Sequence, residues 1–173
     1  MDLRRNVDRR RRLLFPLLVV PVVAGAVGAS TQSIQSRPEV RLASSTEIDA
    51  AATRAAASTA AVARFLPDDV YQYFAATRKQ PGLAEVHRQW SDVTIIRSGK
   101  GVLRTGSTIT SQREVSPGEW RGDTIQDSIN RPLSAGDVVV IRAGIAHQFT
   151  PTGSDPLVYV TVKVPADAEG MNQ

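Results

Sequence analysis

The chain has 173 residues, of which 42% are hydrophobic and 22% charged, so it is long enough for one globular domain and too apolar to be disordered throughout. It contains no cysteine, which excludes disulfides, thiolate metal ligands and a cysteine nucleophile. The first 29 residues carry six arginines against two aspartates, whereas the rest of the chain carries 15 basic and 15 acidic side chains, so no basic patch of the kind that binds nucleic acid is left there.

Residues 1–29 are typical of an export signal. A cationic stretch precedes the apolar run LLFPLLVVPVVAGAVGA, and Val27-Gly28-Ala29 offers a cleavage site before Ser30. Arg11-Arg12-Leu13-Leu14-Phe15 also resembles a twin-arginine signal. We therefore expect an exported protein, periplasmic or secreted. The alternative is an uncleaved membrane anchor, although the run of 17 residues with two prolines is short for a span of about 20.

Residues 30–66 are predicted to form a linker followed by an alanine-rich helix. The linker, STQSIQSRPEVRLA, is polar and has no period. In the next segment, Ser44 and Glu47 have the spacing of a capping box, and the alanines favour a helix of about 15 to 18 residues. Its apolar face, with Ile48, Val62 and Phe65, has few large anchors. We therefore expect a helix that packs against the outside of the domain rather than one that binds a partner.

Residues 67–165 are predicted to form an all-β domain, followed by a tail at 166–173. Turn signals such as Pro81-Gly82 and Pro117-Gly118 separate short β-branched and aromatic runs, which predicts a sandwich or small barrel. The runs are VYQYFAAT, GLAEVHRQ, DVTIIRS, GVLRT, STITSQR, DTIQDSI, DVVVIRA, AHQFTP and LVYVTVKV. Gly106-Ser107 suits a two-residue hairpin between GVLRT and TITSQ. One face of the last strand is expected to carry Val158, Val160, Val162 and Val164.

Both histidines of the chain stand on predicted strands, and carboxylates accompany them. Glu85 and His87 are two residues apart, so both side chains leave the same face of a strand. Asp92 opens the next strand and lies beside that face if the two strands pair as a hairpin. His147 follows sixty residues after His87, at the end of the apolar run GDVVVIRAGIAHQF. Two imidazoles and one or two carboxylates that converge inside a barrel make a metal site.

From about Val70 to Val164 the sequence resembles a single cupin domain. The second cupin motif has glycine, five residues, proline, one residue, glycine, two residues and histidine; it matches Gly136, Gly144 and His147, with Arg142 in place of the proline and Pro151 where asparagine is usual. The first motif has histidine, one residue, histidine, three or four residues, glutamate, six residues and glycine. Its spacing matches Glu85, His87, Asp92 and Gly99, with glutamate replacing the first histidine and aspartate the glutamate. EVHRQWSDVTIIRSGKG and GEWRG are also similar to a subgroup of small single-domain cupins.

The resemblance implies a jelly-roll β-barrel in which Glu85, His87, Asp92 and His147 bind one divalent ion near the mouth. Asp92 is expected either as a fourth ligand, as a base beside the metal, or as a hydrogen-bond partner of a ligating imidazole. Glu85 is expected as a ligand, with a role as a base as the alternative. Oxygen ligands favour Fe(II), Mn(II) or Zn(II) over a softer ion. A barrel without metal, in which both histidines are ordinary polar residues of a pocket, is the other interpretation.

Four further residues are candidates for the pocket. Thr94, Ile96 and Phe149 are expected to line it. Phe149 is two residues after His147 on the same predicted strand, so the two side chains point the same way. Arg142 stands at the barrel mouth, where it either holds an anionic substrate or is solvated. Trp90 and Trp120 are expected to be packing residues.

Two functions follow from this interpretation. The first is a metal-dependent enzyme, such as an oxygenase, isomerase or lyase, acting on a small organic molecule, with Glu85 and Asp92 as candidate catalytic residues. The second is a non-catalytic module that binds a small ligand without metal. Titratable groups facing the cavity beside the ligands would favour the enzyme, and an aromatic and apolar lining would favour the binding module. We expect a small-molecule partner and no nucleic acid, with membrane contact only if the leader is retained. The sequence leaves open whether the protein forms a homodimer.

Overall fold

The structure is a computed structural model that describes residues 40–166. The expected export signal, the first ten residues of the linker and nearly all of the expected tail lie outside the described residues. The described part contains the helix α1 (Ser45–Ala57) and thirteen strands: β1 (Val62–Leu66), β2 (Gln72–Arg78), β3 (Ala84–His87), β4 (Trp90–Ser98), β5 (Lys100–Gly106), β6 (Thr108–Ile109), β7 (Arg113–Ser116), β8 (Glu119–Gly122), β9 (Ile125–Gln126), β10 (Ile129–Ser134), β11 (Val138–Ile141), β12 (Ala146–Pro151) and β13 (Leu157–Pro165).

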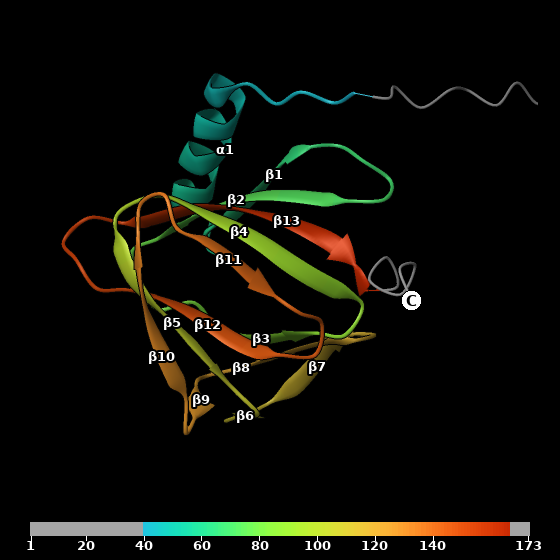
Figure 1. The fold of residues 1–173 in the computed structure, drawn as a ribbon, viewed down its shortest axis with the longest axis vertical. Coiled ribbons are helices and arrows are strands. Elements are labelled where there is room, and N and C mark those ends of the chain that lie inside the picture. The colour runs from blue at the N-terminus through green and yellow to red at the C-terminus, as the bar shows by residue number, and fades with distance from the viewer. Residues whose placement is uncertain (1–39, 167–173) are drawn as a thin grey trace, which may run out of the picture. The chain divides into compact units, whose positions relative to one another are not determined.

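Two antiparallel sheets face each other and form the jelly roll that the sequence predicted. One sheet has the order β1-β2-β13-β4-β11, and the other has the order β10-β5-β12-β3-β8-β7. A small third sheet pairs β6 with β9. Figure 1 shows the two larger sheets one above the other, with α1 on the outer side of the five-stranded sheet, where it packs against β1 and β2.

The helix α1 begins at the predicted capping box. The Ser44 side chain accepts a hydrogen bond from the Glu47 backbone N–H, and the Glu47 carboxylate accepts one from the Ser44 backbone N–H at 2.8 Å. The expected length was wrong, because α1 has 13 residues and ends at Ala57. Val62 and Phe65 belong to β1, which pairs with β2. For these β-branched and aromatic residues, cross-strand packing stabilises the strand more than the neighbouring alanines stabilise a helix.

Two expected hairpins do not form. Gly106-Ser107 joins β5 to β6, but β5 pairs with β10 and β12, and β6 pairs with β9. The strands β3 and β4 lie in opposite sheets, so they do not pair with each other either. In both cases a short connection carries the chain from one sheet to another, because each strand finds its partner far along the sequence.

The interior is divided between an apolar layer and a polar layer along the same strands. One buried cluster brings together side chains from both sheets: Ala76, Ile96, Leu103, Leu133, Ile141, Phe149, Leu157 and Tyr159. On β13, Leu157 and Tyr159 belong to this cluster, whereas Thr161 and Lys163 follow on the same face. The four valines of β13 do share one face, as expected, but it is the outer one. The interior face of β13 therefore runs from apolar to polar.

Within residues 40–166, no helix has both the length and the apolar character needed to cross a membrane.

Candidate metal centre

Glu85, His87 and His147 come together because β3 and β12 are neighbours in one sheet. His147 lies directly opposite Glu85 in the antiparallel register, so both side chains leave the same face. His87 is two residues further along β3 and shares that face. One ligand atom from each of the three residues lies within 4.8 Å of the others. This triad has the donor set of a two-histidine-and-carboxylate metal site.

The ring of His87 is held by Glu119. These two residues are opposite each other in the β3–β8 ladder, and the Glu119 carboxylate accepts a hydrogen bond from Nδ1 of His87. The other ring nitrogen, Nε2, is buried and has no hydrogen-bond partner; Oε2 of Glu85 is 3.5 Å away. With the proton on Nδ1, the Nε2 atom carries a lone pair that can bind an ion.

His147 presents the same nitrogen to the same space. Its Nδ1–H donates a hydrogen bond to the backbone carbonyl of Ile145 at 3.0 Å, which leaves the lone pair of Nε2 available to bind an ion. The two imidazole rings have their centroids 5.2 Å apart, and both side chains are almost fully buried. Both Nδ1–H groups are held by other acceptors, so both Nε2 atoms are available to bind a divalent ion.

Asp92 reaches this site from the opposite sheet. It lies on β4, and its Oδ2 is 3.7 Å from Nε2 of His87 and 3.5 Å from Nε2 of His147. Its other oxygen, Oδ1, accepts from Nζ of Lys163 at 2.9 Å, because Lys163 is opposite Asp92 in the β13–β4 ladder. Asp92 is therefore beside the triad rather than one of its three members. The expected closeness to His87 holds, although the expected hairpin does not.

Both carboxylates are ionised in the folded protein. Burial alone would raise the pKa of Glu85, but the His87 ring 3.5 Å away and the neighbouring His147 and Arg121 outweigh it and lower the pKa to about 2. For Asp92, burial is likewise outweighed by the His147 ring 3.5 Å away and by Lys163, and the pKa falls to about 2. A carboxylate with so low a pKa is a good ligand or hydrogen-bond acceptor and a weak base at neutral pH.

These side chains line a cavity of about 800 Å³ between the two sheets. Of the four expected pocket residues, Phe149 forms part of the wall. Ile96 lies in the apolar cluster instead, and Thr94 is fully buried behind a 2.8 Å hydrogen bond to Thr161. Arg142 is exposed on the loop before β12 and is not part of the wall. The volume is that of a pocket for a small organic molecule.

Three functional side chains of the wall were missed at the sequence level. Glu119, Lys163 and Tyr159 reach the cavity through cross-strand register, which a single sequence does not show. A signal for two of them was present: in LVYVTVKV, Tyr159 and Lys163 stand on the face opposite the valines. The segment that contains Glu119 had no strand signature.

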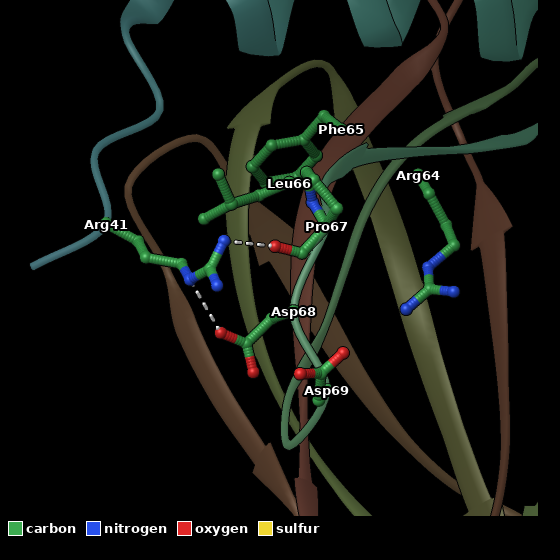
Figure 2. A pocket seen from close by; sticks show the side chains of 7 residues that line it. All are labelled: Arg41, Arg64, Phe65, Leu66, Pro67, Asp68 and Asp69. Atoms are coloured by element: carbon green, nitrogen blue, oxygen red, sulfur yellow. Dashed lines mark hydrogen bonds and ion pairs between the residues drawn. The ribbon is translucent and has the colours of Figure 1, made fainter. Parts of the chain in front are cut away.

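A second, smaller hollow of about 380 Å³ lies at the turn between β1 and β2. Figure 2 shows that Arg41 reaches across it, with a hydrogen bond to the Pro67 carbonyl and an ion pair with Asp68 at 3.1 Å. These contacts tie the segment before α1 to the β1–β2 turn, and none of the candidate metal ligands lies there.

No protein-family model matches the sequence, and no curated protein does. Solved structures do match. A protein from Bacillus halodurans is 15% identical, with 76% of this chain and 84% of the other covered and a TM-score of 0.51. An uncharacterized conserved protein with a double-stranded β-helix domain from Klebsiella pneumoniae is 19% identical, with 75% and 94% covered and a TM-score of 0.51. An RmlC-like cupin from Shewanella frigidimarina is 12% identical, with 64% and 79% covered and a TM-score of 0.43. At these identities the likeness concerns the fold alone.

Proposed function

Since the described part of the chain has the fold of the cupin superfamily, we propose that it is a mononuclear metal-dependent enzyme acting on a small organic molecule. One observation carries this proposal: one ring nitrogen from each of two imidazoles and a carboxylate oxygen lie within 4.8 Å of one another on the wall of a cavity. Glu85, His87 and His147 would hold the ion. Their donor set favours Fe(II), Mn(II) or Zn(II).

A bound ion of this kind supplies Lewis acidity, or redox chemistry if it is iron. The chain's own residues do the rest. Glu119 and the Ile145 carbonyl fix the two imidazole rings through their Nδ1–H groups, so the Nε2 atoms need no reorganisation. Lys163 keeps Asp92 ionised, and Oδ2 of Asp92 lies beside the imidazoles, where it would accept a hydrogen bond from a bound molecule.

Titratable groups beyond the ligands favour an enzyme over a passive binding module. Asp92, Lys163 and Tyr159 all face the cavity beside the triad. The aromatic wall formed by Phe149 and Tyr159 would also serve the alternative function, a non-catalytic module that binds a small ligand without metal. Metal content separates the two functions, because only the first requires an ion.

The test is elemental analysis of the purified protein and of the variants His87→Ala and His147→Ala. We expect about one divalent ion per chain in the wild type and loss of most of it in each variant. Circular dichroism should show an intact β-rich domain in both variants, because the apolar cluster does not include either histidine. A metal content that is unchanged in both variants would refute the proposed centre.

We also propose that the protein acts outside the cytoplasm, which residues 1–29 support through their arginines, apolar run and small-residue site. The mature chain should begin at Ser30 or close to it. N-terminal sequencing of the protein from an exporting host tests this, and a soluble species that still begins at Met1 or Asp2 would contradict it.

A further inference from the structure

The charges on the cavity wall balance before any ion binds. Three cationic side chains, Arg78, Arg121 and Lys163, and three carboxylates, Glu85, Asp92 and Glu119, belong to the described wall. A divalent ion therefore leaves an excess of two positive charges in a cavity between the two sheets. Because charges interact strongly where water is scarce, such a cavity favours an anionic ligand over a neutral one.

One of the three cations has no carboxylate partner. Arg121 pairs with Glu85 at 3.3 Å and Lys163 pairs with Asp92 at 2.9 Å. Arg78, in contrast, donates from Nε to the Tyr159 hydroxyl at 3.2 Å and from Nη1 to the Ala60 carbonyl at 2.9 Å, both of which are neutral. Among residues 40–166, no carboxylate lies within ion-pair distance of Arg78. Its direct hydrogen-bond acceptors are therefore neutral, and Glu85 acts on its charge only from beyond ion-pair distance.

An aromatic wall joins Arg78 to the triad. The His147 ring meets Phe149 edge to face, with centroids 6.2 Å apart. Phe149 stacks on Tyr159, with centroids 4.6 Å apart and planes 25° apart. The Tyr159 hydroxyl then contacts Arg78. A molecule lying along Phe149 and Tyr159 would therefore have the triad at one end and the guanidinium at the other.

The Tyr159 hydroxyl adds a second donor at the Arg78 end. Its oxygen accepts the hydrogen bond from Arg78 Nε, so its own proton is available to another acceptor. Burial raises the pKa of Tyr159, which keeps the phenol protonated at neutral pH. Guanidinium and phenol together offer the donors that a carboxylate binds.

We propose that the site takes a small organic carboxylate, with the carboxylate on Arg78 and the Tyr159 hydroxyl and the apolar body along Phe149 and Tyr159. This inference rests on the proposed function, since it assigns a substrate class to the same cavity. It assigns Arg78 as the residue that selects the anion. Arg121, which is already paired with Glu85, is its matched control in the same wall.

Isothermal titration of the zinc-loaded protein with benzoate and phenylacetate, and with benzamide and phenylacetamide as neutral counterparts, tests the proposal. We expect at least one carboxylate to bind at least tenfold more tightly than its amide. Arg78→Gln should weaken that carboxylate about tenfold or more, the factor expected when a charged donor is lost, and leave the amide unchanged. Arg121→Gln should change carboxylate binding less than Arg78→Gln does.

Equal binding of acids and amides, no binding of either acid to the wild type, or full binding by Arg78→Gln would overturn the proposal. Arg78→Lys, which keeps the charge and loses the planar fork, should bind the acid with intermediate affinity and replaces Arg78→Gln if the latter does not fold. Zinc content of each variant, measured in parallel, separates the two proposals. Arg78→Gln should retain the ion. If the wild type takes up no zinc but still prefers acids in a way that depends on Arg78, the metal centre is refuted and the carboxylate site is supported.

Discussion

At the residue scale, the two carboxylates of the site have different positions and should have different roles. Glu85 has its direction fixed by the pleat of β3 and belongs to the triad. Asp92 faces the triad from the other sheet and shares its charge with Lys163. The first is placed as a ligand, and the second as a group that acts on what the ligands hold.

This difference predicts that Glu85→Gln weakens metal binding more than Asp92→Asn does. Loss of a ligand oxygen should exceed the about 10- to 100-fold loss that is typical when a hydrogen-bonding partner of a ligand is removed. Competitive titration of both variants with zinc against a chelating dye measures it. The reverse order would make Asp92 the ligand and Glu85 a bystander or a base.

Glu119 should act on the ion through His87. Glu119→Gln removes the negative charge that holds the Nδ1 proton, and we expect about tenfold weaker zinc binding with an unchanged fold. Glu114→Gln is the matched control, because Glu114 lies on the adjacent strand and, within residues 40–166, accepts a hydrogen bond from the Gly118 backbone N–H. Equal zinc affinity in the two variants would show that Glu119 does not position the ring.

Metal binding should weaken as the pH falls. Burial acts to lower the pKa of His87, but the Glu85 carboxylate 3.5 Å from Nε2 and the charge of Asp92 outweigh burial, and the pKa is raised above its ordinary value of 6.5. Because an imidazolium cannot bind a metal, affinity should be full well above this raised pKa and fall as the pH drops through it. Zinc titrations between about pH 8 and pH 6 measure the effect. An affinity that is flat across this range would contradict it.

At the scale of the elements, cross-strand register brings the site together. His147 is opposite Glu85, Glu119 is opposite His87, and Lys163 is opposite Asp92. Each of these three contacts is therefore a pair of directly facing residues on neighbouring strands. A one-residue shift of any of these strands would turn its functional side chains to the outer face.

The turn between β4 and β5 offers a test of how tightly these strands are held. Gly99 has φ of 79°, and a Cβ added there would lie 2.2 Å from the Pro156 carbonyl oxygen. Gly136 has φ of 94° and open space around it. We expect Gly136→Ala to cost about 1 kcal/mol of unfolding free energy, from backbone conformation alone, and Gly99→Ala roughly 3 kcal/mol, because the backbone must also move. Urea unfolding compares them, and equal costs would refute the close approach.

At the scale of the whole molecule, the sequence predicted the class of fold and the three residues that the structure brings together in the triad. Strand-like runs, the capping box at Ser44 and the motif spacings of Glu85, His87 and His147 are local patterns, and local patterns can be read from one sequence. Sheet membership cannot. The hairpin at Gly106-Ser107 was wrong, and Glu119 and Lys163 were missed, because each depends on which distant strand lies alongside.

The most direct test of the metal centre is pulsed electron paramagnetic resonance on the protein loaded with Mn(II). The arrangement of His87 and His147 predicts couplings from two imidazole nitrogens, with one lost in His87→Ala and the other in His147→Ala. A wild-type spectrum without nitrogen coupling, or spectra that neither substitution changes, would contradict the account.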